Sequence, residues 1–351
     1  MRYKLLGRSG LRVSELCLGA MTFGEEWGWG ASEAESRRMF DAFLDAGGNF
    51  IDTANVYTQG TSERFLGDFM TGKRARTVLA TKFTNTLETG DPNAGGNQRK
   101  NMMQAVEASL RRLKTDYIDL YWLHVWDALT PIEEVMRAFD DLVRQGKVLY
   151  VGVSDAPAWV VARANTLAEL RGWSAFVALQ IEYSLMQRTP DRELLPMARA
   201  LGLTVTPWGV LAGGLLTGKY GADARQTEPR RFDSPMFASR ARLDDHRRTI
   251  ADAVQAVARA LGRSPSQVAL AWVRHQPGEI IPILGTRRMA QLEDNLDCLN
   301  LTLSADHLEK LDEVSRIELG FPHEFYRTEM VDRLVYGGLR SRIDDRGVPA
   351  A

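Results

Sequence analysis

The sequence predicts an α/β fold, a single (β/α)8 TIM barrel that occupies the whole chain, residues 1–351. Short apolar runs rich in β-branched residues alternate with stretches of helical periodicity, which is the pattern of parallel strands joined by crossover helices. No Gly-x-Gly-x-x-Gly follows the first run, where a doubly wound dinucleotide-binding sheet would carry it. Eight such runs follow one another without a linker or a break in composition, and this favours closure into a barrel.

The predicted strands are short and mostly apolar. In chain order they are Leu16 to Ala20, Asn49 to Thr53, Thr77 to Thr81, Ile118 to Leu123, Val148 to Val153, Ala178 to Ile181, Leu203 to Pro207 and Ile280 to Leu284. Two additions flank them. A hairpin of Tyr3 to Leu6 and Leu11 to Ser14 is expected to plug the bottom of the barrel, and a tail begins after about Ile317.

Three of the predicted helices begin with recognisable start signals. Thr130-Pro131-Ile132-Glu133 has the form of a capping box with proline at the first helical position. Ser32 with Glu35, and Ser264 with Gln267, open two further helices in the same way. Each such helix presents one apolar face, which can cover one side of a parallel sheet.

Composition and charge exclude several classes of protein. Hydrophobic residues make up 44% of the chain and charged residues 25%, which is typical of a globular protein. The 44 Lys and Arg nearly balance the 45 Asp and Glu, so no overall field would attract nucleic acid or an acidic membrane. Leu201 to Gly218 is uncharged, but its five glycines and Pro207 make it a poor membrane helix.

The two cysteines and the first residues of the chain indicate the cellular compartment of the protein. Cys17 and Cys298 are far apart and in no metal or disulfide spacing, so we expect two buried, reduced thiols. The first residues lack the apolar stretch of a signal peptide. A cytoplasmic location is therefore expected, with a small molecule as the partner, and the chain as either a monomer or a homo-oligomer.

Four residues stand out as candidates for catalysis. Asp52 ends the second predicted strand, Tyr57 follows in the next loop, Lys82 ends the third strand and His124 ends the fourth. Taken singly, each has an ordinary structural explanation, such as a turn cap, a rim residue or a satisfied core histidine. Barrels of this type carry their active sites at the carboxyl ends of the strands, so these side chains should meet at one mouth.

The ordinary pKa values of these four side chains indicate the chemistry that they could perform together. A phenol has an ordinary pKa of about 10, and a neighbouring ammonium stabilises its anion. Lys82 can supply that charge, while Asp52 would keep Lys82 charged and in place. His124 would either hold a substrate oxygen or share its proton. Tyr57 is thus predicted to donate a proton to a developing alkoxide.

The loops after the seventh and eighth strands are predicted to bind phosphate, as is common in this fold. Gly213 to Lys219 has the spacing of a P-loop, but Tyr220 stands where Ser or Thr would hold magnesium, which argues against an ATPase. The glycines can still bring the backbone close to a pyrophosphate. After the eighth strand, Arg287 suits the 2′-phosphate of NADP, ahead of a helix with polar residues. Trp208 offers a flat ring for stacking, although a core role is equally consistent with its position.

Nearly the whole chain resembles the aldo-keto reductase superfamily, in particular members similar to aryl-alcohol dehydrogenases and to the β subunits of potassium channels. The segments that carry this resemblance are Leu6-Gly7-Arg8-Ser9-Gly10-Leu11, Leu18-Gly19-Ala20-Met21-Thr22-Phe23-Gly24, Asp52-Thr53-Ala54-Asn55-Val56-Tyr57, Ala80-Thr81-Lys82, Leu123-His124, Gly146-Lys147-Val148, Gly152-Val153-Ser154 and Leu215-Leu216-Thr217-Gly218-Lys219-Tyr220. The resemblance implies an NADPH-dependent carbonyl reductase without metal, with Tyr57 as general acid and Asp52, Lys82 and His124 completing a tetrad.

The resemblance also implies a set of cofactor contacts. Ser154, Asp155 and Gln180 match residues that hold the nicotinamide carboxamide, and Trp208 matches the ring stacked on the nicotinamide. The other positions implied to bind NADPH are Gly19, Ala20, Met21, Asp52, Gly209, Leu211, Gly213, Lys219, Gly285, Arg287, Gln291, Asp294 and Asn295. Asp155 replaces the usual Asn, and Gly209 with Val210 replaces the usual Ser-Pro, so cofactor affinity is more in question than the chemistry.

The aromatic residues near the expected mouth indicate the substrate. Trp27 and Trp29 follow the first strand, Phe83 the third and Trp126 the fourth. Such a rim would favour apolar or aromatic carbonyls as substrates, and ordinary packing of the loops explains these residues equally well. The tail around Phe321 to Phe325 could also reach the pocket.

Two other functions remain open from the sequence. A cofactor-binding regulatory subunit with little turnover would keep the same NADPH contacts. A class I aldolase would use the strand-end lysine, Lys82, to form a Schiff base.

Overall fold

The computed structural model describes residues 1–220 and 244–344, and its centre is the predicted (β/α)8 barrel. An eight-stranded sheet has the order β10-β3-β4-β5-β6-β7-β8-β9, and its strand pairs are parallel. The strands are β3 (Cys17–Gly19), β4 (Phe50–Asp52), β5 (Val78–Phe83), β6 (Ile118–Leu123), β7 (Val148–Ser154), β8 (Phe176–Glu182), β9 (Thr204–Trp208) and β10 (Ile283–Gly285).

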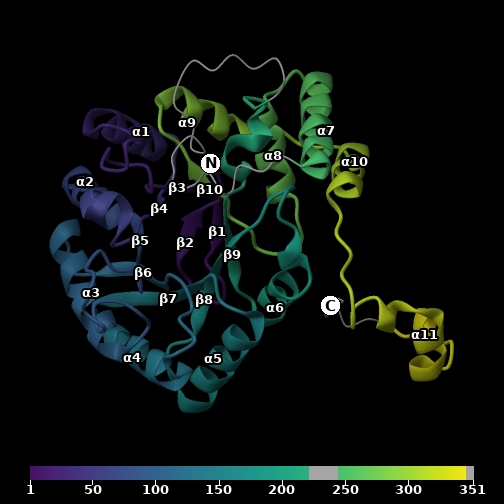
Figure 1. Cartoon of the computed structure of the whole chain (residues 1–351), viewed down its shortest axis with the longest axis horizontal. Coiled ribbons are helices and arrows are strands. Elements are labelled where there is room, and N and C mark those ends of the chain that lie inside the picture. Colours follow the sequence, from purple (N-terminus) through teal and green to yellow (C-terminus); the bar gives the residue numbers. More distant parts are fainter. Residues whose placement is uncertain (221–243, 345–351) are drawn as a thin grey trace.

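The sheet closes between β9 and β10 (Figure 1). The Val205 amide donates to the Glu279 carbonyl at 2.7 Å, and the Ile281 amide donates to the Val205 carbonyl at 2.9 Å. The eighth strand was expected from Ile280, but β10 begins only at Ile283. Pro282 explains the difference, because proline has no N–H to donate to the ladder.

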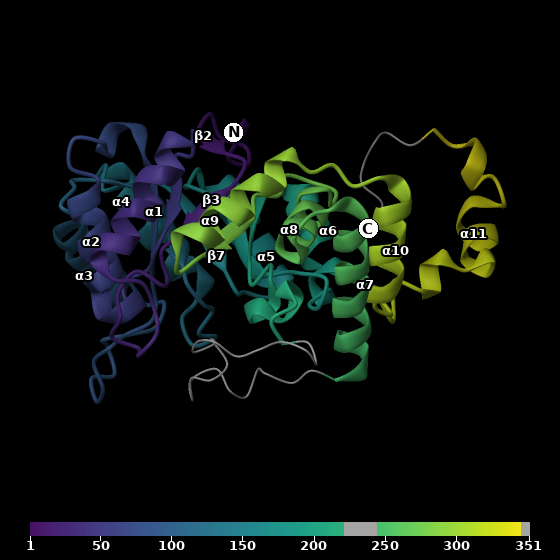
Figure 2. The ribbon, with the colours of Figure 1, turned by 90° about the horizontal axis from the view of Figure 1, so that it is seen from above.

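Helices form the outer layer around the strands (Figures 1 and 2). The helices of this layer are α1 (Glu33–Asp45), α2 (Thr61–Phe69), α3 (Arg99–Leu113), α4 (Ile132–Arg144), α5 (Ala158–Arg171), α6 (Leu194–Leu201), α7 (Asp245–Leu261), α8 (Pro265–Arg274), α9 (Met289–Leu296) and α10 (Ala305–Ser315), and a further helix, α11 (Glu329–Tyr336), follows them in the chain. Within residues 1–220 and 244–344, no helix combines the length and apolarity needed to cross a membrane.

The predicted N-caps of two helices are confirmed and the third is wrong, while the side chains of Glu35 and Gln267 bond to Met289 and Asp294 rather than back to the caps. Ser32 and Ser264 accept hydrogen bonds from the amides of Glu35 and Gln267. Thr130 caps nothing, because its hydroxyl donates to Asp127 Oδ2 at 2.9 Å, and Pro131 occupies the N-cap position of α4 rather than the first helical position. A turn centred on Asp127 thus competes with the cap for the threonine.

The N-terminal hairpin plugs the bottom of the barrel, as predicted. Strands β1 (Tyr3–Leu5) and β2 (Arg12–Ser14) pair antiparallel, and Figure 1 shows them inside the ring of parallel strands. Leu6 and Val13 are fully buried in one cluster with side chains of the barrel interior. With the bottom filled, a ligand has access from the opposite end, where the parallel strands end.

The tail after α10 leads away from the barrel. In both Figures 1 and 2, α11 lies apart from the ring of strands and helices. Two contacts hold the beginning of the tail near α6: His323 Nε2 lies 3.0 Å from Glu193 Oε1, and Arg192 donates to the Glu318 carbonyl at 2.9 Å. Phe321 is 84% exposed, and residues 321 to 325 do not line the cavity at the mouth.

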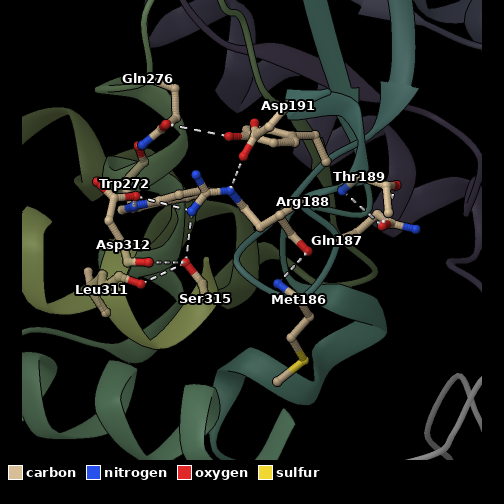
Figure 3. Close-up of polar contacts among 12 residues, drawn as sticks. Met186, Gln187, Arg188, Thr189, Asp191, Trp272, Gln276, Leu311, Asp312 and Ser315 are labelled. Atoms are coloured by element: carbon tan, nitrogen blue, oxygen red, sulfur yellow. Dashed lines mark hydrogen bonds and ion pairs between the residues drawn. The ribbon is translucent and has the colours of Figure 1, made fainter. Parts of the chain in front are cut away.

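A polar cluster around Arg188 joins the loop after β8 to helices α8 and α10 (Figure 3). The guanidinium donates to Asp191 at 2.6 Å, to Asp312 at 3.1 Å and to Ser315 at 2.8 Å. It also lies 4.8 Å from the centre of the Trp272 ring, whose N–H donates to Asp312. Because Arg188 is largely buried, its loss would leave two carboxylates without their main counter-charge.

We therefore predict that Arg188→Met destabilises the fold. Removing one partner of a buried pair costs about 3 to 5 kcal/mol, and the partial exposure of Asp312 reduces the expected loss of unfolding free energy to about 1 to 3 kcal/mol. Urea unfolding followed by circular dichroism measures this loss. Arg333→Met is the matched control, because the Arg333–Glu329 pair on α11 is exposed, and equal stability of the two variants would contradict the prediction.

Candidate active site

A cavity of about 600 Å³ opens at the carboxyl ends of the strands. Its wall is built by the loops that follow these strands, as the fold requires. Three of the four predicted catalytic residues line it, namely Asp52, Tyr57 and His124. The fourth, Lys82, lies just beneath and is fully buried.

A buried ion pair between Lys82 and Asp52 forms the floor of the cavity. Lys82 Nζ lies 2.5 Å from Asp52 Oδ2 and donates to the Thr53 carbonyl at 2.7 Å. The other carboxylate oxygen, Asp52 Oδ1, accepts from Gln180 Nε2 at 3.0 Å. Lys82 Nζ also lies 4.8 Å from the centre of the Tyr57 ring. The ammonium therefore stands between the carboxylate and the phenol.

The alternation of side chains along β5 explains why Lys82 points inward. Val78 and Ala80 pack inside the barrel, so the period of two places Lys82 on the same face. Phe83 then faces outward, is fully buried, and stacks on Tyr121 at 5.4 Å. The prediction that Phe83 lines the substrate pocket is thus wrong. β5 also runs one residue beyond Lys82, which therefore does not end the strand.

Burial and charge set the protonation states of the site. Burial raises the pKa of Tyr57 above its ordinary value, and the nearby Lys82 opposes that rise. Burial alone would lower the pKa of Lys82, but Asp52 and Tyr57 raise it above its ordinary value. Burial, and then Lys82, hold the pKa of His124 well below its ordinary value. At neutral pH the site thus holds a charged lysine beside a neutral phenol and a neutral imidazole.

His124 lies beside Tyr57, with the ring centres 5.7 Å apart in an edge-on arrangement. Its Nδ1 is 3.2 Å from Nδ2 of Asn85, a residue of the loop after β5 that also lines the cavity. Sequence reasoning missed Asn85. The only available signal was its position in the loop that follows Lys82, and nothing in the residue type marked it.

The carboxyl ends of β7, β8 and β9 form the next part of the wall. Ser154 and Gln180 are buried and line the cavity, as does Trp208. The Trp208 indole N–H donates to Asp155 Oδ1 at 3.2 Å. Asp155 therefore uses its carboxylate as an acceptor from the tryptophan, which orients both side chains. Its φ of +44° shows that this turn takes a left-handed conformation at a non-glycine residue.

The glycine loop after β9 bends sharply beneath a lysine side chain. Gly213 and Gly214 have φ of +65° and +99°, which favour glycine. A Cβ at Gly214 would lie 2.2 Å from Lys219 Cε, so the lysine crosses directly over this glycine. The loop thus combines close backbone approach with a positive charge, as a site for an anion requires.

Helix α9 supplies the far end of the wall. The Arg287 amide donates to the Gln291 side chain at 2.9 Å, which fixes the start of the helix. Asp294 accepts from Ser264 and from Gln267, each at 2.9 Å. Both of its oxygens are therefore held by the start of α8, so Asp294 anchors α9 against α8.

The cavity includes all but one of the positions predicted for a cofactor. Ala20 is the exception: it is fully buried, and its carbonyl accepts from Ser62 and its amide donates to the Asp52 carbonyl. The other predicted positions that line it are Gly19, Met21, Gly209, Leu211, Gly285 and Asn295. Besides Asn85, the lining residues outside the predicted set of site residues are Thr22, Val56, Val210, Gly214, Thr217, Ser266, Leu270, Ile283 and Leu284.

Two of the four predicted aromatic residues line the cavity. The Trp27 and Trp29 rings lie 6.0 Å apart, and Trp27 meets the Tyr57 ring edge-on at 6.4 Å. Trp126 instead packs against the hydrophobic core beneath its loop, and like Phe83 it does not line the cavity. In the part of the chain that the structure describes, no group of His, Cys, Asp and Glu could hold a metal ion. Cys17 and Cys298 are free and buried.

Comparison with known proteins finds one matching family profile and several proteins of similar sequence. The profile of the aldo/keto reductase family matches residues 15–316. The chain is 38% identical to an aryl-alcohol dehydrogenase of Pestalotiopsis microspora, over 92% of this chain and 85% of the relative. It is 36% identical to a norsolorinic acid reductase of Aspergillus flavus, over 95% and 87%. It is 38% identical to an NADP(+) aryl-alcohol dehydrogenase of Phanerodontia chrysosporium, over 90% and 86%.

The ion pair gives a stability prediction that does not depend on function. Lys82→Met should lower the unfolding free energy by about 3 to 5 kcal/mol, because Asp52 would keep its charge in a buried site without a counter-ion. Adding Asp52→Asn removes that charge and should restore at least about half of the loss. Urea unfolding of the two variants measures both changes, and a double variant no more stable than Lys82→Met would refute this explanation.

Proposed function

This chain belongs to the aldo/keto reductase family of oxidoreductases, and from that premise we propose that it reduces aldehydes and ketones with hydride from NADPH and a proton from Tyr57. The observation that carries the proposal is the Lys82 ammonium, 4.8 Å from the Tyr57 ring and paired with Asp52. A phenol in this position can give up its proton to a substrate oxygen, because the ammonium stabilises the phenolate that remains.

The cavity suits a dinucleotide of this kind. Ser154 and Gln180 present polar groups beside the ring of Trp208, where a nicotinamide would lie. Gly213, Gly214 and Lys219 suit a pyrophosphate, and Arg287 suits the additional phosphate of NADPH. When bound, NADPH supplies the hydride that reduces the carbonyl carbon.

The residues of the chain complete the reaction. As the carbonyl carbon receives the hydride, its oxygen gains negative charge and takes the proton of the Tyr57 hydroxyl. Lys82 stabilises the phenolate, and Asp52 keeps Lys82 protonated. The reverse reaction uses the same groups, with the Tyr57 phenolate accepting the proton of an alcohol.

We propose apolar or aromatic carbonyls as substrates. Trp27 and Trp29 stand beside Tyr57 at the mouth and offer flat apolar surfaces to a ring. The names of two relatives refer to aryl alcohols. A screen of aromatic and aliphatic aldehydes with NADPH consumption as the readout tests this preference.

The geometry argues against the aldolase alternative. A Schiff base requires a neutral amine that can reach the substrate. Lys82 is fully buried, and Asp52 and Tyr57 hold its pKa above the ordinary value, so the amine remains charged. Lys82 is therefore better suited to electrostatic support than to nucleophilic attack.

Tyr57→Phe tests the proton donor, because it removes one oxygen and keeps the ring. General acid catalysis contributes about 10²- to 10⁴-fold, so kcat for aldehyde reduction should fall by at least about 100-fold. NADPH affinity, measured by quenching of tryptophan fluorescence, should change little. Near-normal turnover of the variant would exclude Tyr57 as the donor. A wild type that binds NADPH but reduces no carbonyl would favour a regulatory, cofactor-binding subunit.

Arg287→Met tests the choice of cofactor. A hydrogen bond to a charged group contributes about 1.5 to 3 kcal/mol, so the ratio of kcat/KM for NADPH to that for NADH should fall by about tenfold or more. Arg288→Met is the matched control, because Arg288 is exposed and does not line the cavity. A wild type that prefers NADH, or an unchanged ratio in Arg287→Met, would show that Arg287 does not select the phosphate.

A further inference from the structure

We propose that Asn85 is a positioning residue that keeps the proton of His124 on Nε2, so that His124 donates a hydrogen bond to the substrate oxygen. This inference rests on the proposed function, since it assigns a role to His124 in the same reaction. Asn85 is not part of the set predicted from the sequence. The structure adds it through one contact, to the ring of His124.

That contact restricts the tautomer of the imidazole. Asn85 Nδ2 lies 3.2 Å from His124 Nδ1. With the amide nitrogen of Asn85 facing the ring, the side chain donates this hydrogen bond and Nδ1 accepts it, which is the arrangement of an Nδ1 without a proton. Burial and the neighbouring Lys82 hold the pKa of His124 well below its ordinary value, so the ring is neutral. A neutral imidazole with a bare Nδ1 carries its proton on Nε2.

The loop around Asn85 is held in place by the loop that carries Tyr57. Asn55 Nδ2 donates to the Asn85 carbonyl at 2.9 Å, and the Asn55 amide donates to the Lys82 carbonyl at 3.2 Å. The His124 amide in turn donates to the hydroxyl of Thr84 at 3.2 Å. Asn85 is therefore fixed relative to His124, Lys82 and Tyr57 by hydrogen bonds of the loops themselves.

The tautomer decides what His124 can do in the reaction. With its proton on Nε2, the ring presents a donor to the cavity, and the substrate oxygen can receive one hydrogen bond from His124 and the proton from Tyr57. With the proton on Nδ1, Nε2 would be an acceptor and would compete with the substrate for the Tyr57 hydroxyl. The sequence left two roles open for His124, which could either hold the substrate oxygen or share its proton. The contact with Asn85 favours the first role, because it leaves Nε2 as a hydrogen-bond donor.

Nitrogen NMR of the imidazole tests the tautomer directly. Protein labelled with ¹⁵N at its five histidines gives distinct shifts for protonated and bare ring nitrogens, and His124→Asn assigns the signals. We expect Nε2–H in the wild type at pH 7. In Asn85→Asp the carboxylate can only accept, so a proton should appear on Nδ1. Nδ1–H in the wild type, or an unchanged tautomer in Asn85→Asp, would overturn the proposal.

Kinetics test the consequence for reduction. Asn85→Asp should lower kcat/KM for aldehydes by about 10²- to 10³-fold, which is the loss expected when one hydrogen-bond donor to a developing oxyanion is removed. Asn85→Leu leaves the tautomer unrestrained, so its kcat/KM should lie between the values of Asn85→Asp and the wild type. Asn93→Asp is the matched control: it adds the same charge to the same loop at an exposed side chain outside the cavity and should retain turnover.

The two measurements separate this inference from the proposed function. Asn85→Asp that changes the tautomer but keeps full turnover would exclude a role for Asn85 in the reaction. A wild type that reduces no carbonyl would instead refute the proposed reductase and, with it, this role of the tautomer. In that case a change of tautomer in Asn85→Asp would still identify Asn85 as the residue that fixes the ring of His124.

Discussion

The ion pair between Lys82 and Asp52 is the interaction on which the site depends. A buried ammonium is tolerated only with a counter-charge and hydrogen bonds, and here Asp52, the Thr53 carbonyl and the Tyr57 ring surround it. These groups come from two adjacent parallel strands and the loop between them, so they meet when β4 and β5 pair. The Asp52 carboxylate also accepts from Gln180 on β8, which ties the opposite side of the barrel to the same charge. The packing of the strands thus sets both the positions of these side chains and the charges at the mouth.

Around this pair, the loops at the carboxyl ends of the strands brace one another with hydrogen bonds. Asn55 links the loop after β4 to the loop after β5, and Asn85 links the latter to His124 after β6. On the other side, Asp155 after β7 accepts from Trp208 at the end of β9. Such contacts between neighbouring loops fix the positions of the side chains at the mouth. Asp155 therefore has a structural partner within the chain.

Much of this architecture could be predicted from the sequence. The alternation of short apolar runs with amphipathic helices identified the barrel, and polar residues at strand ends identified Asp52, Lys82 and His124 because these positions break an apolar pattern. The plug at the bottom followed from a short hairpin ahead of the first strand. The boundaries were less certain, since Pro282 delays β10 and Asp127 draws Thr130 away from its helix. The start of β10 depends on the missing N–H of one proline, whereas the cap of α4 is lost to a competing hydrogen-bond partner, which local propensity does not describe.

The sequence by itself determined the fold class and the residue types available at the mouth, because both follow from local periodicity and from where polar residues interrupt it. Only the tertiary structure decided which of those residues share the cavity. Phe83 was expected at the mouth and points outward, since the strand continues one residue past Lys82 and the alternation of side chains turns it away. Asn85 was not expected and faces His124, since a loop has no periodicity that would reveal its orientation. Contacts between segments that are distant in sequence form only when the strands pair into the barrel, and no local sequence pattern encodes them.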